Sequence, residues 1–451
     1  MNYIPISNQD NKEMLESIGV KNTEELLSAQ IPEVLRAKKL NISEGLSEQQ
    51  LLDLFKSYAQ KNRANLTCFR GAGVYDHFVP SIVDEIVGRS EFWTAYTPYQ
   101  AEASQGTLQA IFEYQSIICE LTGLDCSNAS MYDGATAVAE AVILAIRTTK
   151  KNKIIISKAL NPEYISVMET YIKNLNTEII KIDIDEKNGA INKDTLNSVI
   201  DENVAAVVVQ SPNFFGTVED MQTLSEITKA KKALFISVVN LISLGLFKSP
   251  AEYGADIAVG EGQIFGNSMY MGGSTFGFMA VTKALEWKMP GRIVGQTVDK
   301  DGKRGFVLTL QSREQHIRRE KATSNICTNA ALNSFAACVY AAYLGSQGIK
   351  ELAETNISKA RYAFDKIKNI KGFTPLFKDG FFFNEFVFKT DKDIKKINEE
   401  LLKENILGPL TLTEVCSLKT DDKYKNCIMF AVTEKRTKQE IDKLAEILSR
   451  V

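Results

Sequence analysis

Five short apolar segments decide the fold of this chain: KIIIS (153–157), EIIKI (178–182), VAAVVVQ (204–210), ALFISVV (233–239) and ADIAVG (255–260). They are rich in β-branched residues, and segments with helical spacing, such as NPEYISVMETYIKNL (161–175), lie between them. Nearly continuous apolar strands that alternate with helices are typical of a parallel sheet covered on both faces. The sequence therefore predicts a large α/β domain.

Further elements are expected on both sides of these strands. We predict helices over 104–124, 133–149 and 328–344, and strands over 274–281, 381–388 and 427–433. Asp133 is placed to cap the second of these helices, and Gly272 and Gly273 precede the first of these strands. The last two strands indicate a smaller α/β unit at the C-terminus, which the helix from residue 328 connects to the large domain.

The N-terminal region shows helical patterns only. In SEQQLLDLFKSYAQKN (47–62), the apolar residues have the spacing of one helix face, and either Asn11 or Asn22 is expected to cap a shorter helix. Such a segment cannot bury a core of its own, so we expect it to pack on the rest of the chain or on a partner. The predicted organisation is thus a helical segment (1–65), a large domain (66–325), and a connecting helix with a small domain (326–451).

Composition excludes several classes of protein. The chain has 451 residues, 44% of them hydrophobic and 24% charged, with a formal net charge of −3. These values are ordinary for a globular protein and argue against a nucleic-acid-binding polycation. The longest apolar stretches are shorter than the roughly 20 residues of a membrane span, and no secretory signal pattern is present. With seven scattered cysteines and no CxxC pair, the sequence predicts a cytoplasmic protein with free thiols.

Common catalytic signatures are missing from the sequence. There is no GxxxxGK[ST] phosphate loop and no GxSxG elbow, and two histidines in unrelated segments are too few for a histidine-rich metal site. RGAGVYD (70–76) is a weak match to a dinucleotide fingerprint because it follows no predicted strand. We expect it to form a turn that glycine permits.

A large α/β domain followed by a small one resembles the fold-type I enzymes that use pyridoxal phosphate (PLP). That chemistry needs a helix N-terminus for the phosphate, an acid beside the pyridine nitrogen and a lysine for the Schiff base. Gly134, Ala135 and Thr136 are candidates for the phosphate site, although an ordinary helix cap with small residues for packing explains them equally well.

The other two requirements are not met. Asn240 stands after the strand ALFISVV where the acid is expected, and an amide carries no charge. Gln263 stands after ADIAVGEG where the lysine is expected, and no lysine or arginine occurs between Lys248 and Lys283. The sequence predicts the fold of a PLP enzyme without its two chemical anchors.

Two long blocks, FWTAYTPYQAEASQGTLQAIFEYQSIICELTGLDCSNASMYDGATAVAEA (92–141) and MPGRIVGQTVDKDGKRGFVLTLQSREQHIRREKATSNICT (289–328), closely resemble the N-terminal half of the glycine cleavage system P-protein family. In the divided form of that enzyme this half is a separate alpha subunit, and the beta subunit carries the PLP lysine. The resemblance implies an α2β2 complex, with PLP on the beta subunit and none bound covalently to this chain. It implies decarboxylation of glycine and transfer of the aminomethyl group to the lipoyl arm of the H-protein.

Two other functions remain open at this point. The chain could be a cofactor-free scaffold or regulatory paralogue, or an autonomous PLP enzyme that uses an unexpected lysine. Neither a nucleic acid nor a membrane is expected as a partner, and no metal site is predicted.

Several residues in the two blocks are candidates for contact with glycine or with a channel for the lipoyl arm. Tyrosines combine an apolar body with a polar tip, and arginine can hold a carboxylate with two hydrogen bonds. Structural turns and salt bridges are the alternative roles. The candidates are Tyr96, Thr97, Pro98, Tyr99, Gln100, Arg292, Arg313 and His316, of which Arg313 and His316 could share one helix face.

Overall fold

The chain divides into two units, Met1–Ala64 and Asn65–Val451. A seven-stranded sheet forms the centre of the second unit. The computed structural model describes residues 5–37, 40–269, 275–415, 418–419 and 421–451. The predicted division of the second unit between residues 325 and 326 stays a prediction.

The central sheet has the strand order β2-β8-β7-β6-β5-β3-β4. Its strands are β2 (Cys126–Ser127), β3 (Lys153–Ser157), β4 (Glu178–Ile182), β5 (Val204–Ser211), β6 (Leu234–Val239), β7 (Ile257–Glu261) and β8 (Gly277–Val281). The strands β3 to β7 are parallel and correspond to the five apolar segments, whereas β8 and β2 join one edge in antiparallel pairs. The predicted strand 274–281 is therefore present as β8, and Gly272 and Gly273 lie outside the described residues.

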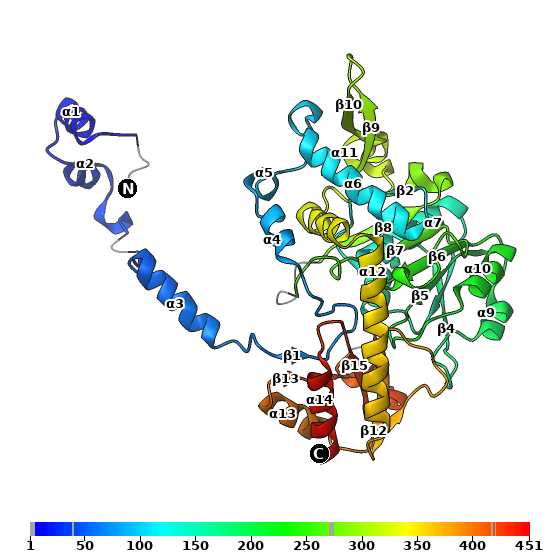
Figure 1. Cartoon of the computed structure of the whole chain (residues 1–451). Helices are drawn as coiled ribbons and strands as arrows, with labels where there is room; N and C mark the ends of the chain where they lie inside the picture. The colour runs from blue at the N-terminus through cyan, green and yellow to red at the C-terminus, as the bar shows by residue number, and fades with distance from the viewer. Residues whose placement is uncertain (1–4, 38–39, 270–274, 416–417, 420) are drawn as a thin grey trace. The chain divides into compact units, whose positions relative to one another are not determined.

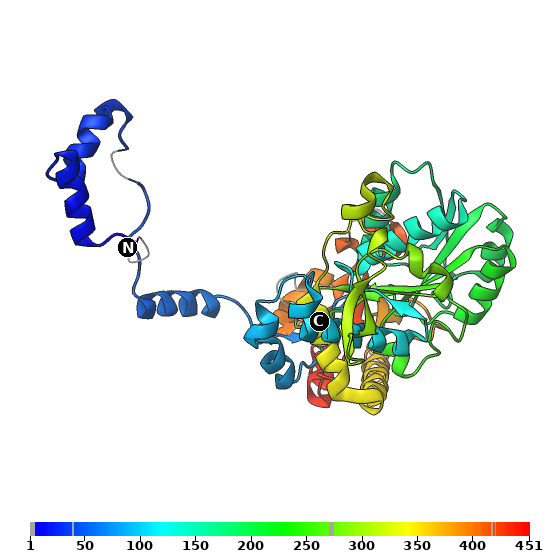
Figure 2. The same cartoon turned by 90° about the horizontal axis from the view of Figure 1, so that it is seen from above.

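Helices cover both faces of this sheet (Figure 2). Apolar residues of α7 (Gly134–Thr149) and α8 (Pro162–Ile172) pack on one face, and those of α9 (Lys193–Val199) and α10 (Met221–Ala230) pack on the other. Alternate side chains of β3 point to opposite faces of the sheet. Ile154 and Ile156 pack with α7 and α8, and Ile155 packs with α9 and α10. Burial of both faces is the reason that these strands are apolar throughout.

The element α12 (Ala331–Lys368) consists of two helices that meet at a kink at Gly345, and it runs beside the central sheet toward the small one (Figure 1). It contacts α6 (Gln105–Thr122) and, further along, α14 (Lys438–Arg450). The prediction that the helix from residue 328 ends near residue 344 is confirmed, because Gly345 has a non-helical backbone, with φ of 62° and ψ of −178°, and separates two helices within α12. The second helix begins beyond Gly345, and its buried residues include Ile349, Ala353 and Ala360.

The small sheet has the order β11-β12-β15-β14, with β11 (Phe373–Pro375), β12 (Glu385–Thr390), β15 (Cys427–Ala431) and β14 (Leu410–Thr411). The predicted strand 427–433 is present as β15, two residues shorter. The predicted strand 381–388 is wrong at its start, because Phe382 and Phe383 pair instead with the loop at Gly216 and Thr217. The helix α13 (Ile394–Lys403) and the short pair β1 (Thr67–Cys68) and β13 (Ile406–Leu407) complete this region.

The sequence reading missed one hairpin. The strands β9 (Ile293–Val298) and β10 (Arg304–Thr309) pair antiparallel around the turn at Gly302, which has a φ of 78°. The segment Asp299–Gly302 lies between two runs with β-branched residues, which is a hairpin signal in the sequence.

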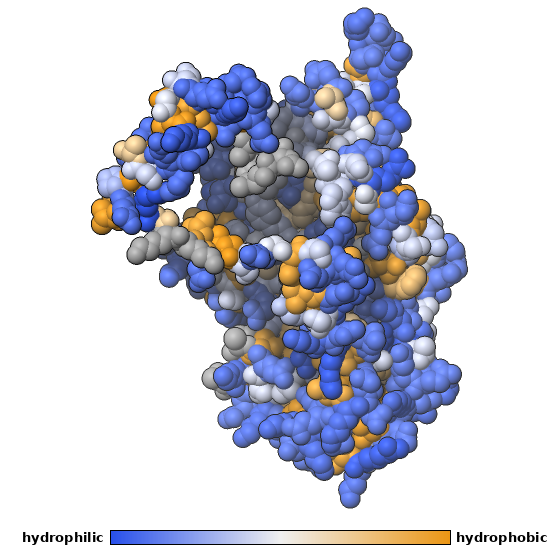
Figure 3. All heavy atoms as spheres, turned by 90° about the vertical axis from the view of Figure 1, so that its left-hand side faces the viewer, coloured by the Kyte–Doolittle hydropathy of each residue, from blue (hydrophilic) through white to orange (hydrophobic). Residues whose placement is uncertain are grey.

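The N-terminal unit contains α1 (Asn8–Ile18), α2 (Thr23–Gln30) and α3 (Glu48–Gln60). Asn22 caps α2 as predicted, but Asn11 lies inside α1, which Ser7 caps by accepting a hydrogen bond from the Asp10 N–H. None of the residues of these three helices is buried, and on α3 the side chain of Phe55 is 61% exposed. Apolar side chains form separate patches on a largely polar surface in the face that Figure 3 shows.

Among the helices that the structure describes, none has the length and apolar character that crossing a membrane requires.

Candidate functional site

The carboxyl ends of β6 and β7 and the N-terminus of α7 form the place where ligands bind in open α/β sheets. Asn240 follows β6 directly, Gln263 lies two residues beyond β7, and Gly134 opens α7. The three positions that fold-type I chemistry needs can therefore be compared with the side chains that this chain puts there.

The side chain of Asn240 stabilises the turn that follows it. Its side-chain Oδ1 accepts hydrogen bonds from the backbone N–H groups of Ile242, at 3.0 Å, and Ser243, at 3.2 Å. An amide whose oxygen caps a turn has neither the charge nor the free acceptor that a protonated pyridine ring requires.

Gln263 is 2% exposed and makes three hydrogen bonds with its side chain. Oε1 accepts from the Tyr75 N–H at 3.0 Å, and Nε2 donates to the carbonyl oxygens of Tyr75 at 3.2 Å and Asn267 at 2.6 Å. The residue at the predicted lysine position is therefore a structural bridge to the segment Gly71–Phe78.

Glu385, on β12, holds the same segment from the small sheet. Its Oε1 accepts from the Ala72 N–H at 2.6 Å, and its Oε2 accepts from the Tyr75 hydroxyl at 2.5 Å. Burial raises the pKa of Glu385 to about 7 even though these hydrogen bonds favour the ionised form. A side chain at Gly71 would not fit, because a Cβ there would lie 2.4 Å from Oε1 of Glu385.

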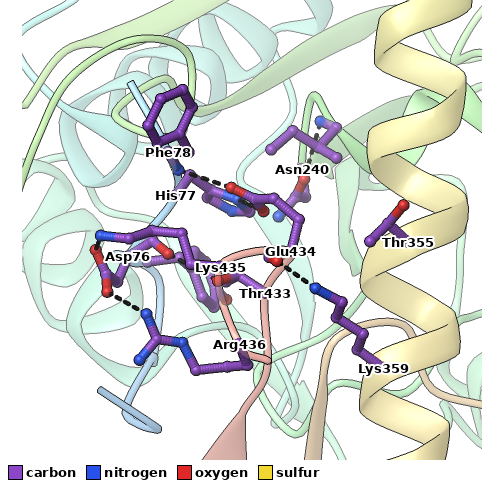
Figure 4. Close-up of polar contacts among 12 residues, drawn as sticks. Asp76, His77, Phe78, Asn240, Thr355, Lys359, Thr433, Glu434, Lys435 and Arg436 are labelled. Atoms are coloured by element: carbon purple, nitrogen blue, oxygen red, sulfur yellow. Dashed lines mark hydrogen bonds and ion pairs between the residues drawn. The ribbon is translucent and has the colours of Figure 1, made fainter. Parts of the chain in front are cut away.

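The far end of the segment is tied to the loop after β15 (Figure 4). Asp76 forms an ion pair with Arg436 at 3.0 Å. His77 Nδ1 lies 2.7 Å from Oε2 of Glu434, and the Phe78 N–H donates to Oε1 of the same carboxylate at 2.7 Å. Burial works to raise the pKa of Glu434, but the hydrogen bonds from His77 and Phe78 outweigh it and lower that pKa. His77 thus helps to tie this segment to the loop after β15.

Covalently bound PLP does not fit this arrangement. The predicted lysine position holds an amide in three hydrogen bonds, and the predicted acid position holds an amide that caps a turn. At the predicted phosphate site, the Gly134 N–H already donates to the carboxylate of Glu261, at 2.9 Å, and the Thr136 N–H donates to Asp133, at 2.7 Å. Thr136 therefore takes part in the N-terminal cap of α7.

A cavity of about 390 Å³ lies between α5 (Ser90–Trp93), α6 and the start of α12. Tyr96, Thr97, Pro98 and Arg292 line it, so the structure brings four of the predicted residues together although almost 200 residues separate Arg292 from the others in sequence. Tyr96 is 81% exposed, which indicates a cavity that opens at the surface.

Arg292 is 5% exposed and is only partly paired. Its Nη2 donates to the Tyr99 hydroxyl at 2.8 Å, and its guanidinium lies 5.2 Å from the centre of the Tyr99 ring. The carboxylate of Glu314 approaches Nε to 3.9 Å, which is too far for a hydrogen bond. Among the described residues, Nε and Nη1 of Arg292 and Oε1 of Glu314 have no hydrogen-bond partner.

The remaining candidates lie outside the cavity. Arg313 donates to the backbone carbonyl oxygens of Leu310 and Gly291, each at 3.0 Å, and to that of Met289. It thereby holds the loop that carries Arg292. The expectation that Arg313 and His316 share one helix face is wrong, since they belong to separate short helices and the side chain of His316 is exposed. Gln100 is exposed at the start of a 3₁₀ turn.

Sequence reasoning missed the buried carboxylate of Glu385 and the half-buried carboxylates of Glu261 and Glu314. A signal for Glu385 was present, because a lone carboxylate within an apolar run such as FFFNEFVF has to find buried partners. No group of three or more His, Cys, Asp or Glu side chains placed to hold a metal ion occurs in the described part of the chain.

Comparison with solved structures defines the class of fold. A C-DES mutant with glycine linked covalently to its PLP cofactor aligns with a TM-score of 0.62, at 14% sequence identity, over 90% of this chain and 99% of its own. The mostly parallel seven-stranded sheet with a small C-terminal sheet is thus the fold of the fold-type I PLP enzymes.

Within that class, a family model for the glycine cleavage system P-protein matches residues 1–448, and the chain belongs to that family. A crystal structure of glycine decarboxylase (P-protein) of the glycine cleavage system, in inhibitor-bound form, has a TM-score of 0.86 and 39% identity over 100% of both chains. The probable glycine dehydrogenase (decarboxylating) subunit 1 of Endomicrobium trichonymphae is 62% identical over 449 residues and 100% of both chains.

Proposed function

We propose that this chain is the alpha subunit of a glycine dehydrogenase (decarboxylating), and that it acts together with a beta subunit that holds PLP. Relatives named as subunit 1 of this enzyme match the whole chain, at 62% and 51% identity. The observation that carries the division of labour is Gln263, which occupies the lysine position and is fixed there by three hydrogen bonds.

The assembled enzyme would take the carboxylate of glycine as CO₂ and pass the aminomethyl group to the lipoyl arm of the H-protein. PLP would supply the electron-withdrawing ring for this reaction from the beta subunit. We expect an α2β2 assembly in the cytoplasm, and we expect the alpha chain alone to be inactive because its own lysine and acid positions are amides.

The cavity around Arg292 is the part of this chain that we assign to the shared active site. A buried guanidinium with unpaired N–H groups attracts a carboxylate, and the gain is large where water is excluded. Tyr96 and Tyr99, which are 81% and 57% exposed, offer apolar rings with polar tips at the rim. Arg292 would contact the carboxylate of glycine, and Tyr96 to Gln100 would border the path of the lipoyl arm. Arg313 would act as a positioning residue for Arg292, and His316 stays a surface candidate.

The test is borohydride reduction after addition of PLP and glycine, followed by peptide mass spectrometry. It is run on this chain alone, on its complex with the co-expressed beta subunit, and on a complex whose beta-subunit lysine is replaced by alanine. We expect an adduct only on the beta subunit, and glycine-dependent CO₂ exchange only in the complete complex.

A stoichiometric lysine adduct on this chain alone would overturn the proposal and indicate an autonomous enzyme. Failure to co-purify with any lysine-bearing paralogue, together with an absence of CO₂ exchange in the mixture, would favour a scaffold or regulatory protein instead.

A further inference from the structure

The carboxylate of Glu261 lies where three segments of the chain meet. Glu261 is the last residue of strand β7, and its side chain accepts three hydrogen bonds from backbone N–H groups. Oε2 accepts from Gly134 at 2.9 Å, and Oε1 accepts from Gln263 at 3.0 Å and from Phe276 at 3.2 Å. The donors belong to the start of α7, to the loop after β7 and to the approach to β8.

A helix N-terminus attracts negative charge, because its first N–H groups are unpaired and the helix dipole adds positive potential. The helix α7 has 16 residues, and fold-type I enzymes use the N-terminus of a helix at this place to bind the phosphate of their cofactor. We propose that Glu261 is a built-in anion that takes the place of that phosphate and closes this chain to phosphate-bearing ligands.

The packing around Glu261 leaves little room for another anion. A Cβ at Gly134 would lie 2.6 Å from the Tyr164 hydroxyl oxygen and 2.8 Å from the Glu261 nitrogen, and Tyr164 packs with the core on this face of the sheet. Burial raises the pKa of Glu261 to about 7, whereas the three N–H donors favour its ionised form. Without this carboxylate, the three N–H groups would lose their acceptor, and an unpaired buried donor is costly.

Glu261 and the missing lysine are two separate reasons why this chain would lack the cofactor. Loss of the lysine removes only the covalent link, whereas Glu261 removes the phosphate site that binds the cofactor before any covalent bond forms.

The test uses the full-length chain with Glu261→Ser, which removes the carboxylate and leaves space at the helix N-terminus. Glu219→Ser is the matched control, because Glu219 is buried and also accepts a backbone N–H, that of Ile191 at 2.9 Å. Thermal unfolding midpoints are measured in increasing inorganic phosphate and in sodium chloride of equal ionic strength.

We expect phosphate to raise the midpoint of Glu261→Ser until the site is saturated, and chloride to have no such effect. The wild type and Glu219→Ser should respond alike to the two salts. A folded Glu261→Ser chain without a phosphate-specific shift would overturn the proposal, and so would an equal shift in the wild type.

If Glu261→Ser does not fold in either salt, Glu261→Gln decides, since it keeps the size of the side chain and removes the charge. Hydrogen exchange of peptides that contain the Gly134 amide should then be at least about tenfold faster than in the wild type, which corresponds to about 1.4 kcal/mol. Unchanged exchange at Gly134 would show that the negative charge is not what the helix N-terminus requires.

Discussion

Replacement of Gln263 by leucine should release the segment Gly71–Phe78 from the central sheet. The substitution keeps the side-chain size but removes one acceptor and two donors, which leaves the N–H and C=O of Tyr75 and the C=O of Asn267 without their partner. Two of these hydrogen bonds, both to Tyr75, hold the segment, and each is worth about 1 kcal/mol, so the segment loses about 2 kcal/mol. Because 1.4 kcal/mol is a factor of ten, hydrogen exchange of the Tyr75 amide should be roughly 30-fold faster.

Hydrogen exchange with mass spectrometry is the suitable assay, since it reports local opening without requiring the whole chain to unfold in one step. Gln222→Leu is the control, because the Gln222 amide makes one exposed hydrogen bond, to Glu226 on the same helix, and should change stability by less than about 0.5 kcal/mol. If peptides that contain Tyr75 exchange at the wild-type rate in Gln263→Leu, the bridging role of Gln263 is refuted.

Three further predictions follow from the same contacts. Gln263→Lys should form no borohydride-reducible adduct with PLP, because the phosphate site stays occupied by Glu261, and a stoichiometric adduct at position 263 would contradict this. The buried Glu385 carboxyl has a pKa of about 7 instead of the ordinary 4.5, so the folded state binds the extra proton and wild-type stability should fall as pH rises from about 4.5 to 7. Glu385→Gln should weaken that slope in urea midpoints compared between pH 5 and pH 8, and an unchanged slope would argue against it. Arg292→Lys keeps the charge but loses the planar pair of donors, so the KM of the complex for glycine should rise at least about tenfold, and an unchanged KM would exclude contact with the carboxylate.

The fold was largely predictable because burial on both faces of a parallel sheet leaves a strong pattern in the sequence. The five central strands and the helices α6 and α7 lie where their apolar segments predict. Errors occur where a local pattern gives way to a contact that is distant in sequence. The apolar run 381–388 reads as one strand, but Phe382 and Phe383 pair with the loop at Gly216 and Thr217, and only the residues from Glu385 pair with β15. The predicted end near residue 344 is correct, because Gly345 separates the two helices of α12, whereas the second of these helices was not predicted.

The sequence by itself determined what this chain lacks. Asn240 and Gln263 stand at two positions that follow predictable strands, and neither side chain can carry the charge or form the Schiff base that PLP chemistry needs. These absences depend only on residue identity and on the local strand pattern, both of which the sequence contains.

Only the tertiary structure decided what these residues do instead. Gln263 bridges to Tyr75, 188 residues away, Glu261 meets the N–H of Gly134, and Arg292 comes to lie beside Tyr99. Hydrogen bonds and partial charge pairing act over a few ångströms in space, and no periodicity along the chain encodes which distant backbone group a buried side chain will meet. The roles of these polar residues therefore follow from how the strands and loops pack together.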